Sequence, residues 1–291
     1  MKRALVFPGQ GSQVVGMGKT LCAAFPVARE VFAEANEALG RNLTEIMFNG
    51  PENELVLTQN AQPALLTCSM AIFRVIEREL KDNSFLKKIT LMAGHSLGEY
   101  SALCASGVFT FLDSVKLVEL RGKGMQQAVP VGDGSMAAIL GLNTEDIKKI
   151  VREASKIDVC DFANDNVEGQ SVISGSISGV EKGIELAKSM GAKRAIMLPV
   201  SAPFHSKLMK PAAEIMENAL AKVAMMEPQV PVVNNINANV ESSIKNIKQN
   251  LVDQVCGRVR WRESIVFMTE QRIGEIIELG CGRVLSGMIR R

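Results

Sequence analysis

Gly94-His95-Ser96-Leu97-Gly98 is a G-x-S-x-G stretch that stands between two segments of different hydrophobic pattern. The run before it, residues 89–93 (ITLMA), predicts a short buried strand, and the run after it, residues 99–106 (EYSALCAS), predicts a helix. A serine at such a turn is pushed out of the sheet, because the flanking glycines allow a sharp bend. The free N–H groups at the start of the helix then point toward any oxyanion that forms beside the serine. The stretch therefore favours a nucleophilic Ser96 over a purely structural turn.

The composition limits the classes of function that the chain can have. Its 291 residues are 47% hydrophobic and 22% charged, which suits one large folded domain or two interlocked ones. Aromatic residues make up only 4% and the net charge is +2, so the sequence argues against nucleic-acid binding. The longest apolar run, residues 61–73, is interrupted by Gln62 and Pro63, so we expect no membrane segment.

Cysteine and histidine usage indicates the compartment and argues against a bound metal. The six cysteines show no C-x-x-C pair, so we expect reduced thiols in a cytoplasmic protein. With two histidines and no Cys/His cluster, we expect no metal site and no cofactor. The loop Gly9-Gln10-Gly11 follows a predicted strand, but Val14 stands where a dinucleotide fingerprint needs glycine, so nucleotide binding is rejected.

The hydrophobic pattern divides the chain into an outer part and an insertion. The insertion predicts the order strand, helix, strand, strand, helix, strand over residues 135–141, 143–155, 157–163, 170–175, 178–190 and 193–198. This is the order of a ferredoxin-like unit. The outer part predicts strands over 4–7, 89–93, 230–233 and 275–279, and helices over 26–39, 63–80, 99–106, 110–129, 206–224, 244–256 and 261–272. In the helix over 63–80 we expect Pro63 near the start, where its missing N–H costs nothing.

A nucleophilic serine needs a base, and the two histidines are the candidates. His95 adjoins Ser96, and neighbours on a sharp turn project in different directions, so His95 is the weaker candidate. His205 stands in a predicted loop between a strand and a helix, where a rigid frame can present a catalytic side chain. In a Ser-His-Asp hydrolase a carboxylate would orient this histidine. The candidate carboxylates that precede His205 in the sequence are Asp161, Asp165, Glu181 and Glu185. Their spacing from His205 does not show which of them would orient it.

Several motifs together carry a family resemblance. They occur along the chain in the order Phe7-Pro8-Gly9-Gln10-Gly11-Ser12-Gln13, Gln62-Pro63-Ala64, Gly94-His95-Ser96-Leu97-Gly98-Glu99-Tyr100, Arg121, Pro203-Phe204-His205 and Gln254. This ordered set resembles the malonyl-CoA:acyl-carrier-protein transacylase family over essentially the whole chain. The resemblance implies an α/β fold with an α/β-hydrolase-like catalytic subdomain, residues 1–130 and 199–291, and an inserted ferredoxin-like subdomain, residues 131–198.

The resemblance also implies roles for the residues of a catalytic site. Ser96 would be the nucleophile, and His205 the general base and later the acid. Gln254 would orient the imidazole through a carbonyl oxygen, so no aspartate partner is expected. The backbone N–H groups of Gln10 and Leu97 would form the oxyanion hole.

Two further residues would select the acyl group. Arg121 would form a bidentate salt bridge with the free carboxylate of a malonyl group, because the guanidinium fork matches two carboxylate oxygens. The alternative is an ordinary solvated arginine on a helix. Phe204 resembles the bulky residue that leaves little room on the acyl α-carbon, which favours malonyl over methylmalonyl. The residues that resemble a polar loop near the acyl-CoA entrance, or equally form a structural turn, are Asn164, Asn166 and Gln170.

The implied reaction is ping-pong transfer of malonyl from malonyl-CoA to the phosphopantetheine thiol of acyl carrier protein, which supplies fatty acid biosynthesis. We expect a monomer that binds these two partners. From Gly257 onward, seven arginines stand against four glutamates, which could steer an acidic carrier or be a solvated surface. The rivals are a serine hydrolase, with water as the acceptor, and a non-catalytic binding module.

Two details depart from the family pattern. Gly280-Cys281-Gly282 replaces the usual Gly-Pro-Gly, which should alter the rigidity of a turn rather than the chemistry. The sequence ends at Arg290-Arg291, slightly early for this family, so we expect a short natural tail beyond it.

Overall fold

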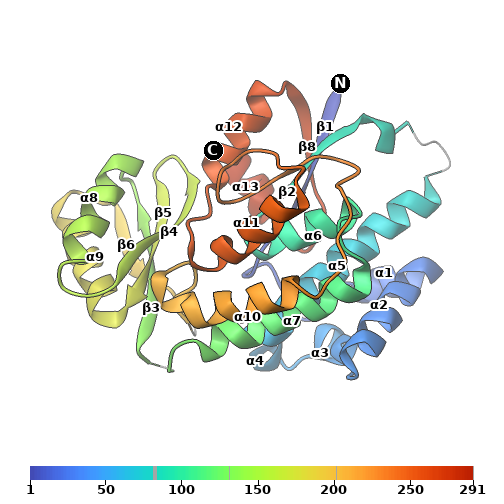
Figure 1. Cartoon of the computed structure of the whole chain (residues 1–291), viewed down its shortest axis with the longest axis horizontal. Coiled ribbons are helices and arrows are strands. Elements are labelled where there is room, and N and C mark those ends of the chain that lie inside the picture. The colour runs from blue at the N-terminus through green and yellow to red at the C-terminus, as the bar shows by residue number, and fades with distance from the viewer. Residues whose placement is uncertain (81–83, 131, 201, 291) are drawn as a thin grey trace.

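The computed structural model describes residues 1–80, 84–130, 132–200 and 202–290 and contains two separate β-sheets with helices around them (Figure 1). The sheet nearer the centre of the molecule is parallel, and the one at the left of Figure 1 is antiparallel. The expectation of a mixed α/β fold is therefore confirmed. No helix among these residues is both long and apolar enough to cross a membrane.

The parallel sheet has both faces buried. Its strands are β1 (Lys2–Phe7), β2 (Ile89–Gly94), β7 (Val232–Val233) and β8 (Ile273–Glu278), in the order β7-β2-β1-β8. Because side chains alternate along a strand, Ala4 and Val6 pack against Trp261 on one face, while Leu5 and Phe7 join the larger core on the other. Burial on both sides explains why residues 4–7 of β1 form an unbroken apolar run instead of an alternating one.

Helices cover the two faces of this sheet unequally. Residues of α12 and α13 pack on one face, and the helices of the larger core pack on the other. The helices of this part of the chain are α1 (Lys19–Ala24), α2 (Pro26–Leu39), α3 (Leu43–Asn49), α4 (Glu52–Leu55), α5 (Thr58–Glu79), η1 (Leu86–Lys88), α6 (Leu97–Ala105), α7 (Phe111–Gln127), η2 (Lys207–Met209), α10 (Lys210–Leu220), α11 (Ile244–Cys256), α12 (Trp261–Glu270) and α13 (Val284–Ile289).

The antiparallel sheet has a small core of its own. Its elements are β3 (Gly134–Leu140), α8 (Thr144–Ala154), β4 (Cys160–Val167), β5 (Gln170–Ser176), α9 (Ile177–Ser189) and β6 (Arg194–Met197). They follow the predicted order of strands and helices, and the strands lie in the order β4-β5-β3-β6. Apolar side chains of α8 and α9, such as Ile147 and Val180, pack with Ile139 and Ile173 of the sheet in a separate cluster. The predicted subdomain boundary at residue 131 lies outside the described residues.

The position of β4 differs from the prediction. The sequence predicts a strand over 157–163 and a turn-rich stretch over 164–169, but the strand runs from Cys160 to Val167. Its polar residues belong in a strand because they find partners in the rest of the molecule: Asp165 binds Arg262, and Asn166 binds His95. Local turn preference was overridden by these tertiary contacts.

The prediction that Pro63 stands near the start of its helix is also wrong. Helix α5 begins at Thr58, so Pro63 lies inside it and provides no N–H for the carbonyl group of Gln59. Arg41 donates a hydrogen bond from Nη2 to that carbonyl oxygen at 3.3 Å. The guanidinium group therefore replaces the hydrogen bond that the proline removes.

Other differences concern short elements. The sequence does not predict α1, α3, α4 or α13, because each is four to seven residues long and shows too little periodicity to detect. The helix expected over 206–224 starts with the 3₁₀ turn η2 and ends at Leu220, and the strand expected over 230–233 is reduced to Val232–Val233.

A contact between two thiols joins the unusual Gly-Cys-Gly turn to α5. All six cysteines are free, and Sγ of Cys281 in this turn lies 3.2 Å from Sγ of Cys68 on α5. The turn therefore packs directly on α5.

The glycines of the G-x-S-x-G stretch allow α6 to lie close to the sheet. A Cβ atom on Gly98 would overlap the carbonyl oxygen of Phe7, and one on Gly94 would overlap the backbone of Gly98. Because the obstructing atoms are backbone, we expect Gly98→Ala to lower the free energy of unfolding by about 3 kcal/mol. Urea unfolding followed by circular dichroism measures this change.

Gly287 in α13 provides the matched control. A Cβ atom there meets nothing within 4 Å, so Gly287→Ala should be neutral or should stabilise the helix by about 0.5–1 kcal/mol. If Gly98→Ala unfolded at the same urea concentration as the parent chain, the prediction that α6 lies too close to β1 to admit a Cβ atom at this position would be wrong.

Candidate active site

Ser96 occupies the turn between β2 and α6. Its backbone has φ 53° and ψ −107°, a conformation that a non-glycine residue adopts only when its surroundings hold it there. Its main-chain N–H donates to Asn235 Oδ1 at 2.7 Å, and Asn235 Nδ2 donates to the carbonyl oxygen of Gly94 at 2.7 Å. The side chain of Asn235 therefore holds both sides of the turn.

His205 is hydrogen-bonded directly to Ser96. Nε2 of His205 lies 2.7 Å from Ser96 Oγ, and Nδ1 lies 2.9 Å and 3.1 Å from the main-chain oxygens of Gln254 and Gly257. Because carbonyl oxygens only accept, Nδ1 carries the proton and the neutral ring leaves Nε2 free to accept the serine proton. A serine hydroxyl, an imidazole and two main-chain oxygens thus stand in one chain of hydrogen bonds, an arrangement in which a serine can act as a nucleophile.

Burial and charge keep His205 neutral. Burial has the largest effect on the imidazole and the positive charge of Arg121 adds to it, and together they lower the pKa of His205 to about 3. The histidine is therefore ready to accept a proton across the neutral pH range.

The other candidate base and the candidate carboxylates lie elsewhere. Nε2 of His95 is 2.8 Å from Asn166 Oδ1, and its ring packs against Trp261. Asp165 is bound by Arg262, and Asp161 accepts from the main-chain N–H of Lys207 at 2.8 Å. Glu181 and Glu185 lie on α9, where Lys182 donates to Glu185. Among the described residues, His205 is hydrogen-bonded to Ser96, Gln254 and Gly257 and to none of these carboxylates.

Arg121 of α7 is buried, with 1% of its surface exposed, which does not fit the alternative of a solvated helix arginine. Its Nη2 donates to Ser96 Oγ at 3.1 Å and to Gln254 Oε1 at 3.0 Å, and its Nη1 donates to Gln62 Oε1 at 2.9 Å. The guanidinium group also lies over the ring of Tyr100, 5.6 Å from its centroid. A positive charge is thus held next to the hydroxyl group of Ser96.

A cavity of about 540 Å³ opens in front of these groups. Gln10, Leu97 and Phe204 border it together with Ser96 and His205. The remaining walls are largely apolar and include Met125, Met136, Leu198 and Val200. Leu97 is the first residue of α6, so its N–H has no partner within the helix and can be donated into the cavity.

Two residues that the sequence analysis did not assign support this arrangement. Glu99 accepts hydrogen bonds at Oε2 from the main-chain N–H of Asn235 at 3.0 Å and from Gln254 Nε2 at 2.7 Å. Asn235 is the second residue after β7, at the carboxyl edge of the parallel sheet where Ser96 also lies. Ligand-binding groups gather at that edge in open α/β sheets, so its position after a strand was a usable signal.

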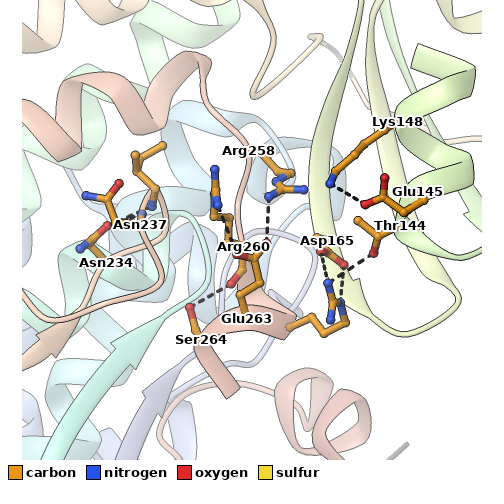
Figure 2. A network of polar contacts seen from close by, with 12 residues as sticks. Thr144, Glu145, Lys148, Asp165, Asn234, Asn237, Arg258, Arg260, Glu263 and Ser264 are labelled. Carbon is orange, nitrogen blue, oxygen red and sulfur yellow. Dashed lines mark hydrogen bonds and ion pairs between the residues drawn. The ribbon is translucent and has the colours of Figure 1, made fainter. Parts of the chain in front are cut away.

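A polar network joins the small sheet to the segment that carries the Gly257 carbonyl. Figure 2 shows Asp165 of β4 beside the arginines that lead into α12. Arg262 donates to both carboxylate oxygens of Asp165 at 3.1 Å, and Glu263 accepts from Arg258 and Arg260. Three of the arginines expected to steer a partner are therefore ion-paired here, and Arg291 lies outside the described residues. The expected arginine surface is thus partly an internal contact.

The chain matches the acyl transferase domain family over residues 4–277. It is 46% identical to the malonyl CoA-acyl carrier protein transacylase of Escherichia coli (strain K12), covering 99% of this chain and 92% of the relative, and 46% identical to that of Bacillus subtilis (strain 168), covering 100% and 90%.

Solved structures show the same similarity. The acyl-carrier-protein S-malonyltransferase from Bartonella henselae superposes with a TM-score of 0.97 at 49% identity, covering 100% of this chain and 92% of that one. A malonyl-transacylase in complex with its type II PKS acyl-carrier protein gives 0.96 at 46% identity, covering 100% and 93%. With this agreement over the full chain, the protein belongs to the acyl transferase domain family and, within it, to the malonyl CoA-acyl carrier protein transacylases.

Proposed function

We propose that Ser96 is the nucleophile, His205 the base and Arg121 the carboxylate-binding residue of an S-malonyltransferase that transfers malonyl from malonyl-CoA to acyl carrier protein. The observation that carries this proposal is the position of Ser96 Oγ, 2.7 Å from His205 Nε2 and 3.1 Å from Arg121 Nη2. One oxygen therefore touches both a base and a fixed cation. A simple esterase needs only the first of these contacts.

The first half-reaction acylates the serine. Ser96 Oγ attacks the thioester carbon of malonyl-CoA while His205 Nε2 takes the hydroxyl proton. The negative charge on the former carbonyl oxygen is stabilised by the main-chain N–H groups of Leu97 and Gln10. When the carbon–sulfur bond breaks, His205 returns the proton to the departing CoA sulfur, and malonyl remains as an ester on Ser96.

The second half-reaction uses the same groups in the opposite direction. His205 takes the proton from the phosphopantetheine thiol of the carrier protein, and the sulfur attacks the ester carbon. Collapse of the intermediate breaks the bond to Ser96 Oγ, and the serine recovers its proton from His205. Gln254 and Gly257 keep the imidazole in the required tautomer through their main-chain oxygens.

The fold description and the setting are part of this proposal. We assign residues 1–130 and 199–291 to an α/β-hydrolase-like catalytic subdomain and residues 131–198 to a ferredoxin-like one, on the strand order of the two sheets and their separate cores. We also propose a monomer that works in the cytoplasm, where free thiols stay reduced. Light scattering on the purified chain tests the monomer.

Intact-mass spectrometry tests the proposed function. After brief incubation with malonyl-CoA, we expect one malonyl adduct, which disappears when acyl carrier protein in its phosphopantetheine form is added and reappears on the carrier. If the adduct were lost to water as fast as to the carrier, the chain would be a hydrolase. If no adduct formed on the parent chain, a binding module would be favoured.

The acylation rate should be insensitive to mild acid. With a pKa of about 3, His205 stays neutral, so kcat/KM for acylation should remain level from about pH 7.5 to about pH 5. Burial raises the pKa of Glu99 to about 7, so Glu99→Gln is measured in parallel to remove that titration. An acid limb with a midpoint near about 6.5 that persisted in Glu99→Gln would show that His205 titrates normally and would contradict the prediction.

The same pKa has a consequence for stability. Below about pH 6.5 the unfolded chain protonates this histidine, whereas the folded chain does so only near pH 3. The unfolded state therefore binds more protons between these values, and this contribution to the free energy of unfolding is complete above about 6.5 and declines as the pH falls.

Phe204 should control the size of the acyl group. Its side chain borders the cavity beside the base, so Phe204→Ala should raise acylation by methylmalonyl-CoA relative to malonyl-CoA by about 10-fold, the usual effect of one methyl group on pocket fit. Leu198→Ala enlarges another wall of the same cavity and is the control. Competition between the two thioesters, read by intact mass, gives the ratio. An equal change in both variants would refute a specific role for Phe204.

A further inference from the structure

Glu99 is a buried carboxyl group that the reaction steps above do not use. It lies in the first turn of α6, three residues after Ser96, and only 2% of its surface is exposed. Its Oε2 accepts from Gln254 Nε2 at 2.7 Å and from the main-chain N–H of Asn235 at 3.0 Å. These two bonds join α6 to α11 and to the segment after β7. Burying a carboxyl group is costly, so its place here requires a reason.

The first bond helps to hold the orientation that the Gln254 amide takes toward Arg121. A guanidinium group only donates hydrogen bonds, so the amide atom that faces Arg121 must be Oε1, which accepts from Nη2 at 3.0 Å. The amide nitrogen then has to face acceptors, and it donates to Glu99 Oε2 and to the main-chain oxygen of Ser96 at 3.0 Å. Glu99 therefore supplies the shortest of the acceptor contacts that hold the amide in this orientation.

Without that acceptor the amide nitrogen keeps only the main-chain oxygen of Ser96 at 3.0 Å and Asn235 Oδ1 at 3.4 Å. The amide of Gln254 is then held less firmly, and its contact with the guanidinium group of Arg121 weakens. The remaining anchor of the terminal nitrogens would be Gln62 Oε1, 2.9 Å from Nη1. A guanidinium group held on one side alone can tilt away from Ser96 Oγ, which it now contacts at 3.1 Å.

We propose that Glu99 is a positioning residue for acyl selection: by holding the Gln254 amide, it fixes the guanidinium group of Arg121 where it meets the carboxylate of the acyl group. The inference rests on the proposed role of Arg121. On this inference, the preference of the site for an acyl group with a free carboxylate depends on Glu99, although Glu99 does not contact the substrate. Glu99 acts through its acceptor oxygen, so replacing its carboxyl group by an amide should preserve the position of Arg121.

Paired variants test this inference. Glu99→Ala removes the acceptor, and Glu99→Gln keeps an oxygen that can accept from both Gln254 and Asn235 while removing the charge. Acylation of Ser96 is measured separately with malonyl-CoA and acetyl-CoA, and the ratio of the two values of kcat/KM is compared. A change that only unfolds part of the sample lowers both rates equally and leaves the ratio unchanged.

We expect the malonyl-to-acetyl ratio to fall about tenfold or more in Glu99→Ala and to stay within about threefold of the parent chain in Glu99→Gln, because small displacements of a binding group cost large factors. An unchanged ratio in Glu99→Ala overturns the inference. An equal fall in both variants also overturns it, since the charge and not the acceptor would then be responsible. If Glu99→Ala does not fold, Gln254→Leu removes the relay while keeping the main-chain oxygen that holds His205, and an unchanged ratio there has the same meaning.

Arg121→Ala separates this inference from the proposed function. If Arg121→Ala keeps the malonyl-to-acetyl ratio of the parent chain, the proposed role of Arg121 fails, and the inference fails with it. If Arg121→Ala loses the ratio but Glu99→Ala keeps it, the proposed function stands and only the role of Glu99 is wrong.

Discussion

Ser96→Ala should abolish the malonyl adduct and lower the rate of transfer to the carrier protein by about 10⁶-fold, the loss seen when the nucleophile of a serine enzyme is removed. The reason is chemical: a ping-pong reaction needs an atom that carries the acyl group between the two acceptors, and alanine provides none. Serine and alanine place the same Cβ on the backbone at φ 53°, so the turn itself should survive. Intact mass and the rate of malonyl transfer measure the two effects.

The control is a serine of the helix that follows Ser96. Ser101 lies in α6, and its buried hydroxyl has no hydrogen-bond partner among the described residues, so Ser101→Ala should leave the adduct and the transfer rate unchanged. His205→Ala should lose nearly as much activity as Ser96→Ala, and the double variant should lose no more than either, because the two groups act as a unit. A malonyl adduct on Ser96→Ala would show that another residue is the nucleophile.

The sequence predicted the elements of this fold whose patterns are long or chemically distinctive. The glycines around Ser96 predicted a sharp strand-to-helix turn, and the packing of Gly98 against Phe7 shows why glycine is required there. The alternation of strands and helices after Gly134 predicted the order of the second sheet. Both signals depend on local geometry, which is encoded in neighbouring residues.

The sequence could not predict contacts that join distant segments. Asp165 and Asn166 have turn preferences when considered alone, and only Arg262 and His95 make them strand residues. The contact between the Gln254 main-chain oxygen and His205 was expected only from the family resemblance, because any residue has a carbonyl group and the residue pattern does not show which one faces the imidazole. Such contacts leave no mark on composition or periodicity.

Arg121 shows the same limit for a site residue. It stands between Glu119 and Lys123, which form an ion pair on the accessible side of α7, so its neighbours indicate a solvated helix face. Its burial results from Gln62, Tyr100 and Gln254, which lie on three other helices. Only the resemblance to a family, and not the residue pattern, suggested a role for it.

Arg121→Ala should lower kcat/KM for acylation by malonyl-CoA by about 10³-fold, because losing one partner of a buried charge pair costs about 2–5 kcal/mol. Acylation by acetyl-CoA should fall much less, since an acetyl group has no carboxylate to bind. Burial is the main cause of the lowered pKa of His205 and the charge of Arg121 adds to it, so that pKa should rise in the variant and the acid limb of the rate should move to higher pH. Separate acylation rates with the two thioesters, each followed against pH, test both parts.

Two further variants make the result specific. Arg121→Lys keeps the charge but loses the fork that binds two oxygens, so its malonyl-to-acetyl ratio should lie between those of Arg121→Ala and the parent chain. Lys123→Ala removes a positive charge two residues away whose side chain is 44% exposed, and its ratio should not change. If malonyl and acetyl acylation fell by the same factor in Arg121→Ala, the guanidinium group would serve only to hold Ser96, Gln62 and Gln254 in place. Carboxylate recognition would then have to come from another part of the cavity.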